Sequence, residues 1–224
     1  MGFSWDDVAY DEQGNIKIKG QHGFTPWASN LFPYKKDGET YKDAPPLHLT
    51  YNGRIFGSVE TTYQSAKALF YDRRLKAKFG VETQLFAIFH SAMGPMEAKK
   101  AAGKTEGSVK GSGFAYAIHA QVKITKKRAG EVYDEILKKD DVNWFGASMG
   151  IMRGLIEQKF GDANPAFARL LISTGTTPIY EQKFRGGTIW EKGGSKSGWG
   201  ALGDLIMARR AELQTADEPE PKRM

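Results

Sequence analysis

Hydrophobic and polar residues follow patterns that predict several short strands. Leu47–Tyr51 and Arg54–Phe56 predict a β-hairpin, because the Asn52-Gly53 pair between them tolerates the positive φ angles of a tight two-residue turn. A further strand is expected at Ile16–Lys19. At 116–124 apolar residues alternate with mostly polar neighbours, which is the period of a half-buried strand, so we expect a strand there too.

Helical spacing dominates the rest of the chain. Ser58 is a suitable cap for a helix that continues to about Phe70 or Tyr71, and its predicted apolar face consists of Val59, Tyr63, Ala66 and Phe70. Weaker helical patterns cover 72–90 and 95–102, and clearer ones cover about 126–139, 144–160 and 165–173. After a glycine-rich run at 186–200, a last amphipathic helix is expected to bury Leu202, Leu205, Ile206 and Leu213.

Length and composition are those of a globular protein. The chain has 224 residues, of which 40% are hydrophobic and 26% charged, so one compact unit is expected. Cysteine does not occur, which excludes disulfides and thiolate chemistry. Four acidic residues lie among the first sixteen, and no run of eighteen apolar residues occurs. We therefore expect an intracellular protein, cytoplasmic or nuclear, without a membrane span.

Positive charge is concentrated in one segment. The net charge is +6, but residues 99–128 contain eight basic residues and one acidic residue, which gives this stretch a charge of +7. Such a segment favours an anionic partner, for example a nucleic-acid phosphate backbone. A solvated charged surface without a partner is the alternative interpretation.

Several common active sites do not fit the sequence. The four histidines are 26, 42 and 29 residues apart, so no zinc-site spacing occurs. No Gly-x-Gly-x-x-Gly motif follows a predicted strand, which gives a dinucleotide site no support. A Gly-x-Ser-x-Gly match occurs at 146–150, but it lies in a predicted helix. A serine hydrolase with this motif needs a histidine later in the chain, and this chain has none after Ser148. We expect neither a metal nor a cofactor.

Glu60, Gln64 and Lys67 form a polar stripe on the helix that follows Ser58. Their spacing of four and three residues places them along one line beside the buried face. Glu60 falls in the first turn, where the helix dipole favours negative charge. An ionised carboxylate beside a sugar carbon can stabilise an oxocarbenium-like transition state or orient a water molecule. Helix stability alone is the alternative explanation for a glutamate at this position.

Four motifs carry a resemblance to a known family. Residues 58–67, Ser-Val-Glu-Thr-Thr-Tyr-Gln-Ser-Ala-Lys, resemble the SVEHxYQAxK signature of the NADAR family, also called YbiA-like proteins. Ser-Asn-Leu-Phe-Pro at 29–33 resembles the SNFxP opening of that family. Trp144 with Met152 and Lys159-Phe160 resembles its W…M…KF helix. The region 170–209, with Trp190 and Gly193-Gly194, resembles its closing pattern. The match covers about 27–210.

The resemblance implies a fold, an activity and site residues. The implied fold is a single-domain α+β fold, mostly helical with a small sheet. The implied activity is N-glycosidic bond cleavage; our first hypothesis is release of ADP-ribose from guanine in DNA. An activity on phosphorylated riboflavin-pathway intermediates and a non-catalytic module that binds ADP-ribose or nucleic acid are the alternatives. Glu60 would be the catalytic carboxylate, and the ligand-binding residues would be Ser29, Asn30, Gln64, Lys67, Trp144, Trp190, Gly193 and Gly194. Among these, Lys67 and the Gly193-Gly194 loop would donate to phosphate oxygens.

The chain also departs from the family. Many relatives have an acidic residue three positions before the tryptophan that corresponds to Trp190, and this chain has Gly187 there. Relatives usually have a glycine directly after that tryptophan, and this chain has Glu191. The asparagine of the family's GxNxLG pattern is replaced by Gly200. Either the role of that acid is missing in this chain, or Glu181 or Glu191 takes it over.

Domain limits follow from the same match. We expect a lead-in at 1–25, a domain at 26–214 with a basic insertion at about 103–142, and a disordered tail at 215–224. The insertion is longer than in typical relatives, and its predicted nucleic-acid contacts are Lys123, Lys126, Lys127 and Arg128. The oligomeric state is left open by the sequence.

Overall fold

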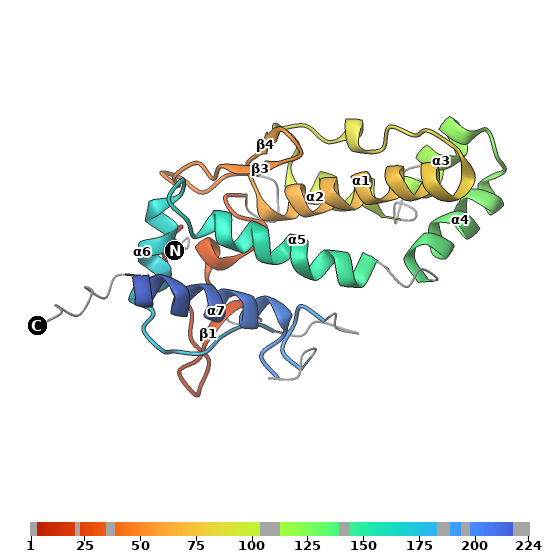
Figure 1. The fold of residues 1–224 in the computed structure, drawn as a ribbon. Coiled ribbons are helices and arrows are strands. Elements are labelled where there is room, and N and C mark those ends of the chain that lie inside the picture. The colour runs from red at the N-terminus through yellow and green to blue at the C-terminus, as the bar shows by residue number, and fades with distance from the viewer. Residues whose placement is uncertain are drawn as a thin grey trace, which may run out of the picture. The chain divides into compact units, whose positions relative to one another are not determined.

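The structure is a computed structural model, and it describes residues 4–20, 23–34, 39–103, 113–138, 144–182, 189–193 and 198–216. The contacts divide the chain into two compact units. Unit 1 comprises Met1–Pro33, Thr40–Leu47 and Ile156–Met224, and unit 2 comprises Tyr34–Glu39 and His48–Leu155. Among the described residues the elements are mainly helices (Figure 1).

Unit 2 is built around the long helix α1, Val59–Phe79, which follows the antiparallel hairpin of β3, Leu49–Tyr51, and β4, Arg54–Phe56. The other helices of this unit are α2 (Pro95–Ala102), α3 (Phe114–Val122), α4 (Lys126–Lys138) and the first part of α5 (Trp144–Lys159). Helix α2 packs along α1, and α3 packs on α4 (Figure 1). The predicted hairpin and the predicted helices at 95–102, 126–139 and 144–160 are confirmed.

Helix α1 begins as predicted and ends later than predicted. The Ser58 hydroxyl accepts a hydrogen bond from the Thr61 backbone N–H at 3.1 Å, which is an N-cap. The helix continues to Phe79 because Tyr71 and Leu75 extend the buried face. It stops at Gly80, whose φ of 64° suits a glycine C-cap.

The helix expected at 72–90 is therefore correct only for its first turns. Between Gly80 and Pro95 the chain forms a loop with one 3₁₀ turn at Phe86–Ile88. Asp72 anchors this loop, since its carboxylate accepts hydrogen bonds from the backbone N–H groups of Leu85 and Phe86, both at 2.9 Å.

The prediction of a strand at 116–124 is wrong, because residues 114–122 form helix α3. Its alternating pattern coincides with a helical one. Phe114 is buried, and so are the residues one and four positions after it, Ala115 and Ile118. Tyr116, which a half-buried strand would have turned inward, is 45% exposed. The core of unit 2 consequently contains the buried face of α3 together with residues of α1, α2 and α4.

Unit 1 contains a three-stranded sheet with the order β2-β1-β5. Strand β1, Ile16–Gly20, pairs antiparallel with β2, Gly23–Phe24, and parallel with β5, Ile179–Glu181. Strand β1 was predicted from its sequence pattern, and β5 was not.

Unit 1 also contains the helices α6, Pro165–Ser173, and α7, Ala201–Ala216. Helix α7 packs against both α6 and strand β5. Gly203 permits the close approach of α7 to the sheet, because a Cβ at this position would overlap the Ile179 carbonyl. The buried residues of α7 include the predicted Leu202, Leu205 and Ile206.

The fold class is confirmed: the chain is α+β and mostly helical, with small sheets. The domain limits stay predictions. The predicted tail lies outside the described residues, apart from its first two residues, which end α7. Within the described part of the chain, no helix is long and apolar enough to span a membrane.

Candidate active site

Glu60 is the second residue of α1, and only 7% of its surface is exposed. The Gln64 side-chain amide donates a hydrogen bond to Glu60 Oε1 at 2.7 Å. Lys99 Nζ lies 3.5 Å from Glu60 Oε2. The free N–H groups of the first helical turn also favour negative charge here. The local structure therefore holds a buried, oriented carboxylate.

Lys99 is a member of this group that the sequence analysis did not assign. It comes from α2, and its side chain is half exposed, whereas the Glu60 side chain is only 9% exposed. The sequence showed Lys99 only as part of a basic stretch. Its position opposite Glu60 depends on the packing of α2 along α1, which no local pattern reveals.

Lys67 lies on the same stripe, but its ammonium group already has protein acceptors. It donates to the Ala102 carbonyl at 3.2 Å and to the Tyr133 hydroxyl at 3.0 Å. Burial lowers the pKa of Lys67 to about 8, although the charge of Glu60 acts in the opposite direction. These two bonds leave one N–H of the ammonium for a ligand. The predicted phosphate contact could therefore use that N–H, and any further bond to phosphate would have to replace a bond to the protein.

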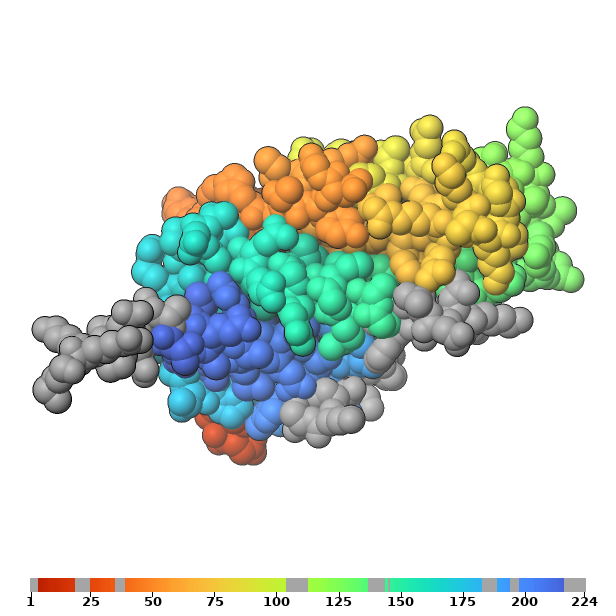
Figure 2. Space-filling model, viewed as in Figure 1, coloured from red at the N-terminus to blue at the C-terminus, as the bar shows by residue number. Residues whose placement is uncertain are grey.

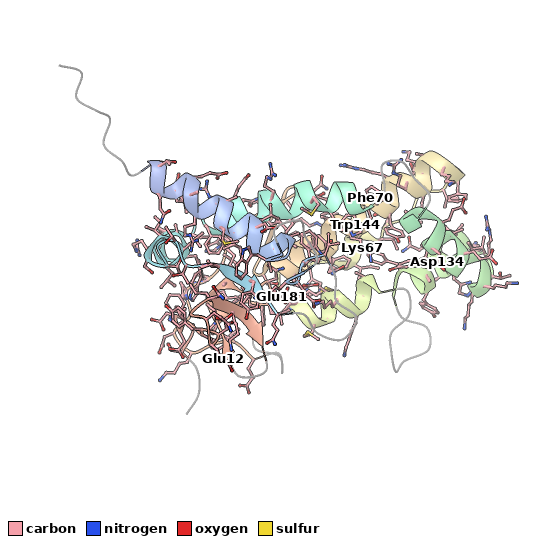
Figure 3. The ribbon with its side chains drawn as sticks, turned by 90° about the horizontal axis from the view of Figure 1, so that it is seen from below. Glu12, Lys67, Phe70, Asp134, Trp144 and Glu181 are labelled. Atoms are coloured by element: carbon pink, nitrogen blue, oxygen red, sulfur yellow. The ribbon has the colours of Figure 1, made fainter. Side chains whose placement is uncertain are left out.

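Trp144, the first residue of α5, is largely buried in unit 2. Its ring centroid is 5.2 Å from that of Tyr63 and 5.5 Å from that of Phe70, both on α1. Figure 3 shows Trp144 next to Phe70. The structure thus brings Trp144 to the helix that carries Glu60, and its role in binding a ligand stays a prediction.

Ser29 and Asn30 lie in unit 1, directly after the 3₁₀ turn Pro26–Ala28. The buried oxygen Oδ1 of Asn30 accepts no hydrogen bond from the part of the chain that the structure describes. A buried acceptor without a donor is unfavourable and is a feature of ligand sites. This oxygen supports the prediction that Asn30 contacts a ligand.

Lys159 holds this segment in place. Its ammonium group is completely buried and donates a hydrogen bond to the Ser29 carbonyl at 2.7 Å. Burial lowers the pKa of Lys159 to about 7. In the sequence, Lys159 contributed only to the resemblance, because nothing local shows that a lysine near the end of a helix is buried.

Trp190 and Gly193 belong to a turn of unit 1 that is fixed by backbone hydrogen bonds. The Trp190 carbonyl accepts from the Leu202 N–H at 3.3 Å, and the Gly193 N–H donates to the Gly198 carbonyl at 2.8 Å. The Gly193 N–H is therefore occupied, and its predicted role toward phosphate stays a prediction. Gly194 and Gly187 lie outside the described residues.

Gly200, where the family has asparagine, has a structural reason to be glycine. Its φ is 82°, and a Cβ would overlap the Glu191 carbonyl and lie 2.5 Å from the Trp190 carbonyl oxygen. A side chain at this position would push the turn away from α7. The departure from the family pattern at 200 is thus accompanied by close backbone packing.

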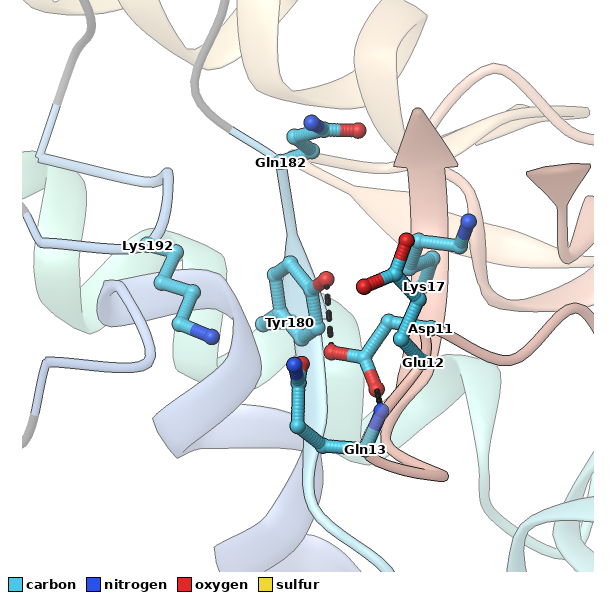
Figure 4. Close-up of a pocket in the computed structure, with 7 residues that line it drawn as sticks. All are labelled: Asp11, Glu12, Gln13, Lys17, Tyr180, Gln182 and Lys192. Atoms are coloured by element: carbon cyan, nitrogen blue, oxygen red, sulfur yellow. Dashed lines mark hydrogen bonds between the residues drawn. The ribbon is translucent and has the colours of Figure 1, made fainter. Parts of the chain in front are cut away.

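A small pocket of about 220 Å³ lies in unit 1 beside β1 and β5 (Figure 4). Tyr180 donates a hydrogen bond to Asp11 at 3.0 Å. Burial opposes ionisation of Asp11, yet hydrogen bonds from Asn15, Tyr180 and Gln13 lower its pKa to about 2. The charged residues that line the pocket are two acidic ones, Asp11 and Glu12, and two basic ones, Lys17 and Lys192. The other lining residues are Gln13, Tyr180 and Gln182. Neither Glu181 nor Glu191 lines it.

The predicted nucleic-acid contacts lie at the surface of unit 2. Lys123 ends α3, and Lys126, Lys127 and Arg128 form the first turn of α4, where all are exposed. Figure 2 shows atoms of the 113–138 segment, in green, at the surface. Arg128 pairs with Glu131 at 3.1 Å. Because the first turn of a helix disfavours cations, this cluster lowers the stability of α4. Its contact with a nucleic acid stays a prediction.

Comparison with protein-family models and with curated protein sequences gives no match. Among solved structures, the chain is similar to the NMR structure of the E. coli protein YbiA, with a TM-score of 0.47 and 15% sequence identity over 100% of both chains. The roles of individual residues in this chain rest on the sequence motifs and on the local geometry described above.

Among the described residues of unit 2, Glu60, Gln64 and Lys67 lie along α1, and Trp144 packs on that helix at Tyr63 and Phe70. Unit 1 carries Ser29, Asn30, Trp190 and Gly193. No three acidic or histidine side chains come together as metal ligands within the described part of the chain.

Proposed function

We propose that this protein is an N-glycosidase that releases ADP-ribose from a nucleobase, and that guanine in DNA is the base. The observation that carries the proposal is the buried carboxylate of Glu60, held by Gln64 and Lys99, within a motif that resembles the NADAR signature.

The reaction needs negative charge next to the anomeric carbon. The bond between the ribose C1 and the base nitrogen breaks, and positive charge develops on the sugar. A carboxylate that is already oriented stabilises this charge without reorganising. The oxygen of a water molecule then bonds to C1, and one proton of that water goes to the nitrogen of the leaving base. The products are ADP-ribose and the unmodified base. In this proposal Glu60 stabilises the sugar cation and orients the water.

Gln64 and Lys99 keep Glu60 in position for this step. The Gln64 amide occupies Oε1, so rotation of the carboxylate is restricted. Lys99 is half exposed and lies 3.5 Å from Oε2, so its ammonium group can move when a ligand enters. The remaining lone pairs of the carboxylate are then available to a water molecule or to the sugar.

One further observation supports the choice of substrate. The exposed cations at the start of α4 are suited to a phosphate backbone, which favours DNA over a small metabolite.

The test compares two substrates and one ligand. Wild-type protein is incubated with DNA carrying ADP-ribosylated guanine, with a phosphorylated riboflavin-pathway intermediate, and with free ADP-ribose in a binding assay. We expect ADP-ribose release from the DNA at a rate that falls with salt. Turnover of the metabolite alone, or tight ADP-ribose binding with no turnover of any substrate, would contradict the proposal and favour one of the two alternatives.

A variant adds a second criterion. Replacing Lys126 and Lys127 by glutamate is expected to weaken DNA turnover and to flatten its dependence on salt, because fewer phosphates are neutralised. An unchanged salt dependence would exclude these lysines as phosphate contacts.

A further inference from the structure

Three elements of unit 2 meet at the carboxyl end of α2. Ala102 is the last residue of α2, so its carbonyl lacks a partner within the helix. Two side chains from other helices occupy this carbonyl: Lys67 of α1 donates to it at 3.2 Å, and the Tyr133 hydroxyl of α4 donates to it at 3.4 Å. Lys67 also donates to the Tyr133 hydroxyl at 3.0 Å. We call Lys67, Ala102 and Tyr133 the polar clamp.

The polar clamp is buried and closely packed. Tyr133 is 5% exposed, and its ring lies 5.2 Å from that of Tyr71. The Lys67 ammonium lies 5.3 Å from the centroid of the Tyr133 ring and 5.8 Å from that of Phe114. These ring faces and two acceptors compensate in part for the burial of a cation. The clamp has a defined geometry because a buried hydroxyl and a buried ammonium both need their partners.

Helix α2 connects the clamp to Glu60. Lys99, which faces Glu60 Oε2, lies three residues before Ala102 on α2. One turn of helix therefore separates the carbonyl that the clamp holds from the lysine that faces the carboxylate. A shift of the α2 end would move Lys99 relative to Glu60.

From this geometry we propose that Tyr133 of α4 is a positioning residue for Glu60, acting through the polar clamp, α2 and Lys99. Helix α4 lies in the segment that the sequence predicts to be an insertion, so this chain would use that segment to support the carboxylate. The inference rests on the proposed function of Glu60. It gives Lys67 a positioning role, in place of the phosphate contact that the sequence suggested.

The kinetic test is a double-mutant cycle on the full chain. Tyr133→Phe keeps the buried ring and removes the hydroxyl from the clamp. We expect kcat on ADP-ribosylated DNA to fall about tenfold with KM within about twofold, since small displacements of a catalytic group lower rates strongly. Lys99→Met should lower kcat by itself. In the Lys99→Met background, Tyr133→Phe should have almost no further effect, because both changes act on the same contact.

The control variant is Tyr116→Phe, which removes a tyrosine hydroxyl from the exposed side of α3. It should leave kcat unchanged. If the effects of Tyr133→Phe and Lys99→Met multiply in the double variant, Tyr133 does not act through Lys99, and the inference is overturned. A loss of kcat in Tyr133→Phe that equals a loss in Tyr116→Phe would overturn it as well.

Hydrogen exchange separates this inference from the proposed function. In Tyr133→Phe the backbone amides of α2 should exchange about tenfold faster than in wild type, and those in Tyr116→Phe should not. This measurement needs no substrate. If wild type is inactive on every substrate while α2 exchanges faster in Tyr133→Phe, the proposed function fails and the clamp stands. Unchanged exchange in α2 refutes the clamp.

Discussion

Replacing Lys159 by methionine should change how stability depends on pH. The Lys159 ammonium group is fully buried, and burial lowers its pKa to about 7, whereas the ordinary value is 10.5. Between these two values the unfolded chain binds a proton at Lys159 that the folded chain does not bind. Stability of the wild type therefore rises with pH in this window, and the contribution of Lys159 is least favourable below about pH 7, where the buried amine is charged.

The magnitude follows from the linkage relation. One proton changes the free energy of unfolding by about 1.4 kcal/mol per pH unit. From about pH 8 to about pH 9.5, wild type should gain about 2 kcal/mol relative to Lys159→Met. Other groups that titrate in this range, including Lys67, are the same in both proteins, so the difference isolates Lys159.

The assay is urea unfolding followed by tryptophan fluorescence at several pH values. Trp27 is a suitable probe because it is buried in unit 1, 6.1 Å from the ring of Phe160. The control is Lys42→Met, which changes an exposed lysine of the same unit. Parallel stability curves for wild type and Lys159→Met would refute the reasoning, since they would mean that the folded and unfolded states hold the Lys159 proton equally.

Three further predictions concern the fold and its surface. Ser58→Ala should lower the free energy of unfolding by about 1 kcal/mol, because the N-cap bond to Thr61 is lost, and unchanged urea unfolding would contradict the cap. Gly200→Ala should destabilise the protein by more than about 2 kcal/mol through overlap with the Glu191 carbonyl and a strained positive φ, whereas Gly150→Ala, in open space on α5, should not; equal melting temperatures for the two would contradict this packing. Glutamate at positions 126 and 127 should weaken DNA binding and yet raise the melting temperature slightly, since acidic residues suit the first turn of α4; a lower melting temperature would argue for a structural role of these lysines.

The predictable part of the fold is the part that local chemistry decides. The Asn52-Gly53 turn and the Ser58 cap use only neighbouring residues, and both were placed correctly. Strand β5 was missed because three residues carry almost no periodic signal, and its pairing partner β1 lies about 160 residues away in the sequence. The α3 segment was misassigned because alternation and helical spacing coincide over nine residues.

The candidate site shows the same division. Helical spacing placed Glu60 and Gln64 on one line, and the structure shows the hydrogen bond between their side chains. Lys99 and Tyr133 were not foreseen, because their contacts depend on how α2 and α4 pack on α1. Lys67 was expected to bind a ligand, and its contacts with the protein were not foreseen, since a sequence gives no sign that a helical lysine is enclosed by aromatic rings.

The central claim is tested most directly by the turnover of Glu60→Gln on DNA that carries ADP-ribosylated guanine. Glutamine keeps the size of the side chain and removes the charge, so stability should change by only about 1 kcal/mol, through the loss of the dipole interaction and the half-exposed Lys99 pair. We predict that kcat falls by at least about a hundredfold in a variant that remains folded. Release of ADP-ribose at the wild-type rate by folded Glu60→Gln would contradict the account.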